Sequence, residues 1–521
     1  MNTDSEASAR TDYDVVVAGG GPVGLLLACE LRLAGVSVVV LERLTEVDTT
    51  IKAGAINAPS ATALDRRGLL PALADVQAKA FEGIAMFIRQ RFPDGDAPPM
   101  KSAPRFAGHF AGIPLSGARL DDDDPAFAGL GPAGDIGLIP QEPLERLLGE
   151  RAARSGVEVR RGGELTDFTA DEHGVTVRAG DTRIRAGWLV GCDGGRSTVR
   201  KLAGFDFPGT PPEITGHQAM VEMTGAEGLA LGWNTTDTGI YAHGPMPGRI
   251  LTVEFDGPPA DRRTPVTAAE LQAALRAVSG VEVTVTKVHT ATRFTDNARQ
   301  ASTYRKGRVL LAGDAAHVHS PFGGQGLNLG LGDAMNLGWK LAAEITGPAP
   351  EGLLDTYTAE RHPIGAWVLD WSRAQVAMMR PDRHARALRA VVKGLMETTT
   401  GTTYFVKHIS GVLHRYDLPG DHPLVGRSAP DLELADGTRL AEHLHDGRAL
   451  LLDLRDTPEL RKPAAAYPDR ITILTAQATT PTAALLIRPD GITAWATDTP
   501  TADPTSLTEA LRHWFGVPTT P

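Results

Sequence analysis

The spacing of apolar residues changes several times along this chain, and each change predicts a different element. Near the start, the β-branched run Val15–Ala18 is typical of a buried parallel strand, Pro22 to Leu33 of a helix, and Val36–Leu41 of a second strand. These elements form a βαβ unit, whose crossover we expect to be right-handed. The pattern therefore predicts a fold of the α/β class.

The middle of the chain follows a different pattern. Residues 81–135 are rich in Gly, Pro and Asp and show no clear period, whereas alternating segments such as "ITGHQAMVEM" and "RILTVEF" within 205–290 predict an antiparallel sheet. Between these stretches, "PQEPLERLLGERAARSG" predicts an amphipathic helix. Strand-like runs follow this helix at 157–160, 175–178 and 184–190.

The last part of the chain returns to a buried strand at "RVLLAGDAAH" and then to helices, with a long one predicted at "GLNLGLGDAMNLGWKLAAEI". A Pro/Gly-rich linker, "RYDLPGDHPLVGRSAPDLEL", precedes a segment with strand, helix, strand periodicity. We therefore predict a Rossmann-like nucleotide-binding domain (1–80, 136–204 and 295–350), an inserted antiparallel-sheet substrate domain (81–135 and 205–294), a helical region (351–418) and a C-terminal domain (425–521).

Composition argues against several classes of partner. Lys and Arg number 52 and Asp and Glu 63, so the net charge is −11, and no basic cluster is present. Nucleic acid and anionic membrane surfaces are therefore not expected as partners. The two cysteines, Cys29 and Cys192, predict neither a disulfide framework nor a zinc site. The polar N-terminus lacks the features of a signal peptide, so we expect a cytoplasmic protein.

The first motif with chemical meaning is the glycine turn between the first strand and helix. Gly19 permits a tight turn, Gly21 lets the backbone approach a pyrophosphate at the helix N-terminus, and Gly24 allows close packing of the helix on the sheet. Glu42 closes the second strand, where a carboxylate accepts hydrogen bonds from ribose hydroxyls and repels a 2′-phosphate. This motif suits the adenosine half of FAD or NAD and does not choose between them.

The second motif, "WLVGCDGGRSTVRKLAG", places Asp193 and Gly194 at the end of a strand and Arg196 at the start of a helix. Taken alone, it is equally typical of a strand-to-helix turn capped by Asp193, Ser197 or Thr198.

The third motif is "GDAAHVHSPFGGQGLN", which follows the late buried strand. Asp314 is suited to bind a polyol chain, and the backbone N–H groups near Gly326–Asn328 open a helix. Helix-terminal donors there would stabilise the negative charge that a reduced isoalloxazine ring develops. A metal site at His317 and His319 is not favoured, because their spacing is i, i+2 and no third ligand accompanies them.

The three motifs, in this order and spacing, resemble the FAD-dependent aromatic hydroxylases, the group A flavoprotein monooxygenases, over roughly residues 12–415. Within that family the chain is most similar to the bacterial polyketide and antibiotic hydroxylases. The resemblance implies bound FAD, with the pyrophosphate at the glycine turn, the adenosine ribose at Glu42 and the ribityl chain at Asp314. It places flavin O2 at the N–H groups of Leu327 and Asn328, with Pro321 beside the ring, and makes Gln141 a contact of FAD. Asp193-Gly194 and Arg196 match the motif that the family uses for both FAD and transient NAD(P)H. The implied cofactor-binding set also includes Pro22, Arg43, Gly313, Gly324, Gln325 and Gly326.

Two features depart from the family pattern. Many members carry an arginine that contacts FAD after the second strand, where "TIKAG" supplies Lys52 and so lacks the planar guanidinium fork. The segment 425–521 resembles the thioredoxin-like domain of this branch but contains no cysteine, which excludes thiol redox chemistry there and leaves packing or dimerisation.

The resemblance also implies the reaction. NADPH or NADH would visit transiently and reduce FAD, and O2 would then give a C4a-hydroperoxyflavin that delivers one oxygen atom to a large, planar aromatic substrate. Because the cofactor carries this chemistry, no catalytic side chain is predicted. We expect the substrate cavity to be lined by His217, Tyr241, His243 and Phe294. The protein is expected to be a monomer or a homodimer.

Other functions stay open at this point. An antibiotic-inactivating enzyme and a Baeyer–Villiger monooxygenase would share the same fold. A protein that keeps FAD but only sequesters a drug would share the motifs as well. A flavin-dependent halogenase is disfavoured because Trp339-Lys340 does not reproduce that family's Trp-x-Trp-x-Ile-Pro stretch, and a plain NAD dehydrogenase would leave the Asp314 motif without a purpose.

Overall fold

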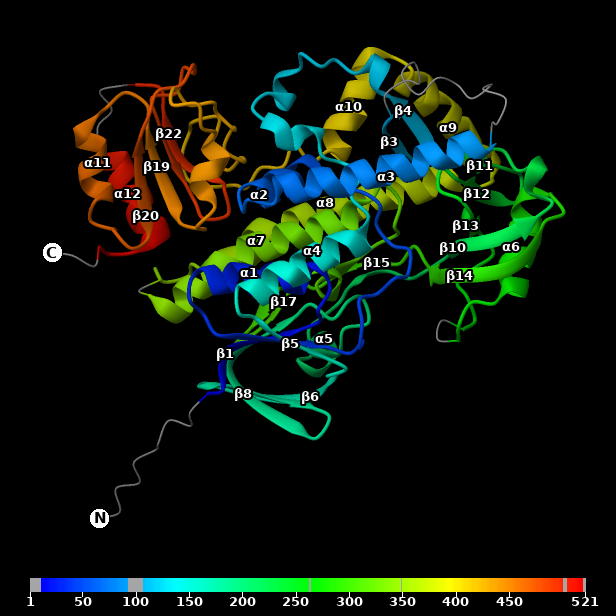
Figure 1. The fold of residues 1–521 in the computed structure, drawn as a ribbon, viewed down its shortest axis with the longest axis horizontal. Coiled ribbons are helices and arrows are strands. Elements are labelled where there is room, and N and C mark those ends of the chain that lie inside the picture. The colour runs from blue at the N-terminus through cyan, green and yellow to red at the C-terminus, as the bar shows by residue number, and fades with distance from the viewer. Residues whose placement is uncertain (1–10, 92–105, 262–263, 348, 500–503, 519–521) are drawn as a thin grey trace.

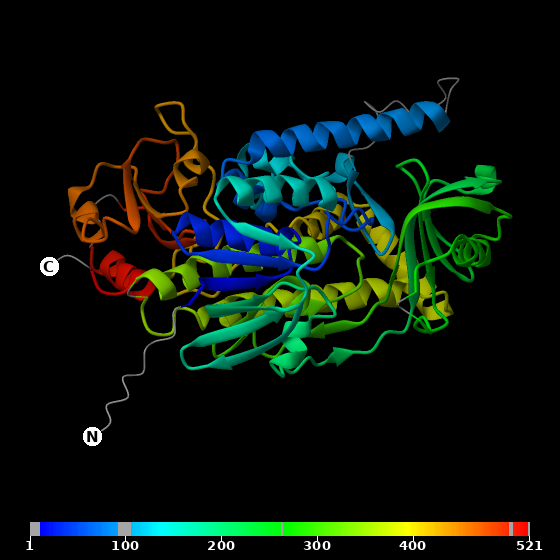
Figure 2. The ribbon, with the colours of Figure 1, turned by 60° about the horizontal axis from the view of Figure 1, so that its bottom comes forward.

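A computed structural model describes residues 11–91, 106–261, 264–347, 349–499 and 504–518 (Figure 1). The C-terminal sheet and the five-stranded sheet lie at opposite ends of the molecule, with long helices and the largest sheet between them, as Figures 1 and 2 both show. Among the described helices, none combines the length and the apolar composition needed to cross a lipid bilayer.

The largest sheet confirms the predicted parallel core. Strand β1 lies at its centre and pairs in parallel with β2 and β8, so that Val15 lies opposite both Val38 and Trp188. The hairpin of β6 and β7 is attached to β8 in antiparallel fashion. The order is β16-β17-β8-β1-β2-β5, formed by β1 (Tyr13–Ala18), β2 (Val38–Glu42), β5 (Glu158–Arg161), β6 (Leu165–Asp171), β7 (Gly174–Ala179), β8 (Thr182–Gly191), β16 (Arg305–Lys306) and β17 (Val309–Leu311).

This sheet is covered by the helices α1 (Pro22–Leu33), α4 (Gln141–Arg154) and α7 (Gln325–Thr346). Helices α1 and α7 approach closely because the crossing carries glycine. A Cβ on Gly338 would lie only 2.6 Å from the Cβ of Glu30. The close crossing fixes the start of α7 relative to the start of α1.

The predicted antiparallel sheet is present, in the order β11-β12-β13-β10-β14. Helix α6 (Ala268–Ser279) covers one face, called here the α6 face, where Leu271 and Leu275 pack against Ala219. On the other face, called the inner face, Leu251 belongs to the hydrophobic cluster that also contains Phe322. The strands are β10 (Thr215–Thr224), β11 (Gly232–Thr235), β12 (Gly239–His243), β13 (Arg249–Glu254) and β14 (Thr284–Phe294).

The remaining helices and short strands join these two sheets. Helix α3 continues to Arg91, so the stretch after position 80, for which no period was expected, begins as helix and crosses the predicted domain boundary. Its amphipathic spacing is maintained through Phe87, which is buried. The connecting elements are α2 (Ala58–Asp65), α3 (Leu70–Arg91), β3 (Phe106–Phe110), β4 (Ile113–Ser116), α5 (Thr198–Leu202), β9 (Gly209–Thr210), β15 (Ala298–Gln300), β18 (His317–Val318), α8 (Thr356–Met379), α9 (Arg383–Met396) and α10 (Thr399–Ile409).

The C-terminal segment forms its own four-stranded sheet, in the order β20-β19-β21-β22, with β19 and β20 parallel and the other pairs antiparallel. Buried arginines fasten it to the rest of the chain: Arg66 donates to the carbonyl of Gly491 at 2.7 Å, and Arg67 to that of Pro489 at 2.7 Å. Its elements are β19 (Ala449–Asp453), α11 (Pro458–Ala464), β20 (Ile471–Thr475), β21 (Ala484–Ile487), β22 (Thr493–Thr497) and α12 (Pro504–Phe515).

Candidate flavin site

The three glycines of the turn after β1 have different steric surroundings. Gly19 has a φ of +108°, and a Cβ there would lie 2.3 Å from the carbonyl oxygen of Cys192. A Cβ on Gly24 would lie 2.0 Å from the carbonyl oxygen of Gly19. At Gly21, by contrast, a Cβ would meet nothing within 4 Å. Gly19 and Gly24 are thus required by the fold, whereas Gly21 borders open space at the start of α1, as a pyrophosphate site demands.

Glu42 lies at the end of β2, beside this turn. Its carboxylate accepts hydrogen bonds from the backbone N–H of Gly20 at 2.6 Å and of Leu44 at 2.8 Å. Each carboxylate oxygen has a second lone pair, so these bonds leave capacity for a ribose hydroxyl. Arg43, the next residue, is exposed.

The second motif forms the predicted helix cap. One carboxylate oxygen of Asp193 accepts the N–H of Thr198 at 2.6 Å and of Val199 at 3.1 Å, and Ser197 caps α5 through the N–H of Arg200. The other carboxylate oxygen of Asp193 is buried and has no partner among the described residues. The helix cap uses one carboxylate oxygen of Asp193, and the other oxygen is left available to a ligand.

The third motif is held by a buried acid that the sequence pattern did not reveal. Asp333, on α7, is fully buried and accepts hydrogen bonds from the N–H of Gly313 at 2.9 Å, from His317 Nε2 at 2.7 Å and from Arg361 Nε at 2.8 Å. Burial alone would raise the pKa of Asp333, but the charges of His317 and Arg361 outweigh it and lower that pKa. Asp333 therefore fixes the turn, and Asp314 projects from it as an exposed side chain.

The loop before α7 is arranged by its own side chains. Gly324, with a φ of +64°, begins α7 without a side-chain cap. The Gln325 side chain donates to the carbonyls of Gly323 and Ile409, and Asn328 accepts the N–H of Asn57 and donates to the carbonyl of Gly324. Gln325 and the Asn328 amide group thus shape the loop, whereas Pro321 and Gly324 are exposed.

Both helices that open at this site begin with glycine and lack a side-chain cap. Helices α2, α5, α6, α9 and α10 are instead capped by the side chains of Asn57, Ser197, Thr267, Asp382 and Thr398. Uncapped N-terminal N–H groups are donors for an anionic or electron-rich ligand. Helices α4 and α8 also lack a side-chain cap, but the starts of α1 and α7 are those formed by the first and third motifs.

The segments near positions 20 and 320 converge in space. A Cβ on Gly313 would lie 3.2 Å from the Val23 side chain, and a Cβ on Gly330 would lie 2.5 Å from it. Asp314 and His319 both lie within 4 Å of the point where a Cβ on Gly326 would be. The first turn of α1, the Asp314 turn and the start of α7 thus form one site. Its open glycine, spare carboxylate oxygen and uncapped helices fit an FAD molecule.

Two further predicted residues lie at the edge of this site. The backbone N–H of Gln141, the first residue of α4, donates to the carbonyl of Ala53 at 2.9 Å. Lys52 is exposed and forms an ion pair with Asp48 at 2.7 Å, while its carbonyl accepts from Gln218 Nε2 on the inner face at 3.4 Å. The Lys52 ammonium thus has a carboxylate partner, Asp48, four residues earlier in the chain.

The four predicted substrate residues divide between the two faces of the five-stranded sheet. Phe294 is on the inner face, with its ring edge-on to Phe322 at a centroid distance of 5.7 Å. His217 is on the α6 face, 2.8 Å from a Glu270 carboxylate oxygen on α6, and the Tyr241 hydroxyl accepts the N–H of Ala230 within the core beneath α6.

His243 on β12 lies directly opposite Ile250 on β13, and the side chain of Ile250 packs beneath α6. His243 therefore points to the α6 face as well. His217, Tyr241 and His243 therefore lie on the face opposite to that of Phe294. Side chains two residues apart in a strand point to the same face, and these three all point to the face that α6 covers.

The histidines and lysine considered for other chemistries have structural partners. His317 binds Asp333, and His319 Nδ1 is 2.7 Å from the Ser320 carbonyl oxygen. Lys340 is fully buried and donates to Asn336 Oδ1 at 2.8 Å. Within the described ranges, no group of three metal-ligating side chains occurs.

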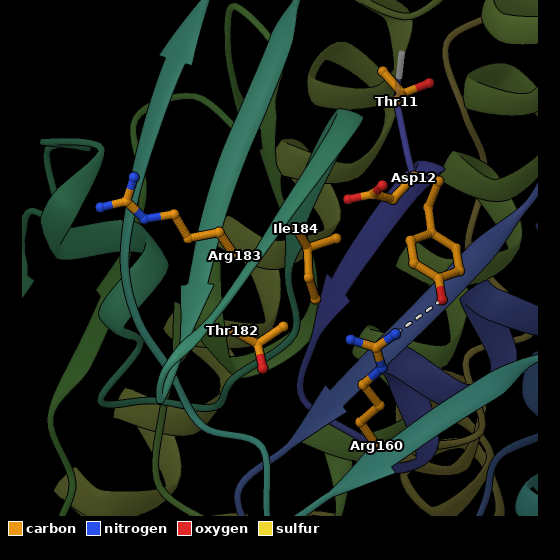
Figure 3. Close-up of a pocket in the computed structure, with 7 residues that line it drawn as sticks. Thr11, Asp12, Arg160, Thr182, Arg183 and Ile184 are labelled. Atoms are coloured by element: carbon orange, nitrogen blue, oxygen red, sulfur yellow. Dashed lines mark hydrogen bonds between the residues drawn. The ribbon is translucent and has the colours of Figure 1, made fainter. Parts of the chain in front are cut away.

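A cavity of about 610 Å³ lies at the other end of the large sheet (Figure 3). It is lined by residues that begin β1 and β8, and Arg160 donates to the Tyr13 hydroxyl there at 3.0 Å. Ligands of α/β sheets bind beyond the carboxyl ends of the strands, where the three motifs are, so this cavity is separate from the flavin site.

Comparison with known proteins agrees with this geometry. Residues 12–372 match the family described as FAD binding domain, and residues 422–518 match the family described as aromatic-ring hydroxylase, C-terminal. The chain is 41% identical to a 12-dehydrotetracycline 5-monooxygenase/anhydrotetracycline 6-monooxygenase of Streptomyces rimosus, covering 97% of this chain and 99% of the relative. It is 39% identical to a rifampicin monooxygenase of Streptomyces venezuelae, with the same coverage.

Among solved structures, the anhydrotetracycline hydroxylase OxyS from Streptomyces rimosus is similar with a TM-score of 0.82 and 40% identity, covering 97% of this chain and 100% of that one. The matches extend over the glycine turn, the Asp314 turn and the C-terminal sheet together. The chain therefore belongs to the family of FAD-dependent aromatic-ring hydroxylases and is a flavin-dependent monooxygenase.

Proposed function

We propose that this monooxygenase uses NADPH or NADH and O2 to insert one oxygen atom into a large aromatic polyketide or antibiotic, most simply as a hydroxylation. The observation that carries the proposal is the convergence of the glycine turn, the Asp314 turn and the start of α7 into one site, next to Phe322, whose ring meets that of Phe294 on the five-stranded sheet. The relatives named for tetracycline and rifampicin substrates support the substrate class.

Within this function each part of the chain has a role. FAD, when bound, supplies the redox and oxygen-transfer chemistry. The open backbone at Gly21 would hold the pyrophosphate, Glu42 the adenosine ribose, and Asp314 the ribityl chain. The N–H groups at the start of α7 would stabilise negative charge at the flavin pyrimidine, as helix N-termini do. Phe294 and Phe322 would exclude water from the substrate side.

The domain assignment follows from these roles. The FAD-binding domain would comprise 1–80, 136–204 and 295–350, and the substrate domain 81–135 and 205–294, with α3 bridging them. The segment 425–521, for which we propose a thioredoxin-like fold, would act by packing, because it has no cysteine.

The proposal is tested by incubating the FAD-loaded protein with anhydrotetracycline, rifampicin and a panel of aromatic polyketides, with NADPH and NADH in parallel. We expect at least one compound to stimulate oxidation of a nicotinamide cofactor and to gain the mass of one oxygen atom. A drug-sequestering protein would instead bind the compound without stimulated oxidation, and this result with every compound would contradict the proposal.

Asp314→Ala tests the placement of the ribityl chain. The Asp314 carboxylate is exposed and accepts no hydrogen bond within the described chain, so its removal should leave the melting temperature of the apoprotein unchanged. Loss of one or two hydrogen bonds to a charged acceptor should raise the Kd for FAD about tenfold or more, measured by flavin fluorescence titration. Normal FAD affinity in this variant would refute the placement, and Asp181→Ala, in an exposed turn, is the control.

A further inference from the structure

Gln375, on α8, connects two distant segments of the chain that meet at the inner face. Its side chain is fully buried. The amide oxygen Oε1 accepts the backbone N–H of Ala111 at 3.0 Å, and the amide nitrogen Nε2 donates to the backbone carbonyl of Phe322 at 3.2 Å. Ala111 lies between β3 and β4, and Phe322 lies in the loop before α7, called here the flavin loop (residues 320–324). One amide group therefore joins the β3–β4 hairpin to the flavin loop.

The turn of this hairpin has a conformation that other parts of the chain must support. Ala111 has a φ of +51°, in the left-handed region that residues with a Cβ rarely adopt. Its N–H is bound by Gln375, and its carbonyl accepts a hydrogen bond from Arg389 on α9 at 2.5 Å. Such conformations persist only where the surrounding structure holds them. The position of the turn therefore depends on Gln375 and Arg389.

The hairpin also forms part of the inner face. Phe110, Ala111 and Ile113 belong to the hydrophobic cluster that contains Phe322. At the turn, a Cβ on Gly112 would lie 3.1 Å from the ring of Trp233 on β11. A molecule that binds at the inner face and displaces the hairpin would therefore act on the hydrogen bond between Ala111 and Gln375.

At its other end, Gln375 lies directly against the flavin loop. A Cβ on Gly323 would lie 2.9 Å from Gln375 Nε2. One turn earlier on α8, the hydroxyl oxygen of Ser372 lies 2.6 Å from that of Ser320, and the two form a hydrogen bond. Pro321, which we expect beside the flavin ring, lies between these two attachments. The loop is therefore anchored to α8 at two points, and the anchor at Gln375 continues to the hairpin.

We propose that Gln375 is a positioning residue that couples the β3–β4 hairpin to the flavin loop, so that occupancy of the inner face changes the position of the loop beside the flavin ring. This inference rests on the proposed function only in taking the substrate to bind at the inner face. Because the amide is closely packed, a shift of Ala111 moves it as a unit and displaces the Phe322 carbonyl. The coupling is reciprocal, so FAD bound at the loop also stabilises the hairpin.

The first test is a double-mutant cycle on the FAD-binding protein. Gly112→Ala perturbs the hairpin, because Gly112 has a φ of +73° and the new Cβ would press on Trp233. We expect it to raise the Kd for FAD at least about fivefold and to change the visible circular dichroism of the bound flavin. In a Gln375→Met background, the same hairpin change should alter neither quantity. Ser372→Ala, which removes the other anchor of the loop, is the control and should keep the full response.

If Gln375 only supported the fold, Gly112→Ala would act on FAD equally in the presence and absence of the Gln375 amide. Equal effects in the two backgrounds would therefore overturn the inference. No effect of Gly112→Ala on Kd and circular dichroism in the otherwise unchanged chain would overturn it as well.

A second measurement uses the unmodified chain, because Gln375→Met leaves two buried backbone groups unpaired and costs stability. Hydrogen exchange of residues 106–116 is followed by mass spectrometry with and without FAD. We expect FAD to slow exchange at the turn at least about fivefold more than in the β6–β7 hairpin, which reports general stabilisation. No such difference would contradict the coupling.

Neither measurement needs a substrate or turnover. Coupling in a protein that oxygenates none of the compounds tested would count against the proposed function alone. Oxygenation without the coupling would count against this inference alone.

Discussion

Gly24→Ala is expected to weaken FAD binding strongly and to destabilise the large parallel sheet. A Cβ at this position would lie 2.0 Å from the carbonyl oxygen of Gly19, and both are backbone-fixed, so α1 would have to move away from the turn. Overpacking of this kind costs about 3 kcal/mol, and we expect a loss of that size in the free energy of unfolding by urea. The displaced helix start would also move its N–H groups away from the pyrophosphate, and we expect the Kd for FAD to rise by about a hundredfold, which corresponds to a loss of about 3 kcal/mol in binding free energy.

Two other glycines separate the steric effect from the loss of the ligand site. Gly21→Ala introduces a Cβ into open space with a φ of −74°, so the apoprotein should keep its stability while the new methyl group obstructs the pyrophosphate and weakens FAD binding. Gly149→Ala, inside α4, should stabilise the protein by up to about 1 kcal/mol and leave FAD binding unchanged. If Gly24→Ala retained both stability and FAD, the steric argument for the turn would fail.

The flavin site could be predicted from the sequence because its parts are local. The spacing of Gly19, Gly21 and Gly24 between a strand and a helix specifies the turn, and Asp314 directly follows a buried strand. Each signal lies within a few residues, and the topology of parallel strands then brings their carboxyl ends together. Asp333 was missed because its partners, His317 and Arg361, are 16 and 28 residues away.

The substrate side was harder to predict because both faces of the five-stranded sheet are buried. Ala219 packs beneath α6 and Leu251 on the inner face, so hydrophobicity does not mark which face meets the flavin domain. The sequence therefore did not show that His217 and Tyr241 lie beneath α6 and Phe294 on the other face.

The C-terminal sheet is joined to the flavin helix by a buried charge network that local sequence also does not reveal. Glu360 on α8 accepts hydrogen bonds from both terminal nitrogens of Arg488, at 2.9 and 2.8 Å. Lys340 Nζ lies 2.9 Å from the Glu360 carboxylate. Arg488 also binds Asp490 and lies 4.5 Å from the Trp514 ring. Burial alone would raise the pKa of Glu360, but the charges of Arg488 and Lys340 lower it to about 2.

Because Lys340 belongs to α7, whose first turn borders the flavin site, this network connects the C-terminal sheet to the cofactor helix. Arg488→Met would remove the cation that both Glu360 and Asp490 bind, and would leave Lys340 beside Glu360 and the charges of Arg66 and Arg67 near Asp490. Breaking a buried ion pair from one side costs about 3–5 kcal/mol, so we expect a loss of that size in the free energy of unfolding, measured in urea on the full-length chain. Arg512→Met, an exposed arginine of α12, should change it by less than about 0.5 kcal/mol.

The double variant decides whether the loss comes from charge or from packing. If uncompensated charge is the cause, Glu360→Gln combined with Arg488→Met should be less destabilised than the sum of the two single variants, by about 1–3 kcal/mol, as is usual for residues in direct contact. If the lost contact of the guanidinium with Trp514 is the cause, the two effects should add, because Glu360→Gln leaves that ring contact in place. Additive effects, or a loss below about 1 kcal/mol in Arg488→Met, would show that apolar packing holds the C-terminal sheet against α7 and α8.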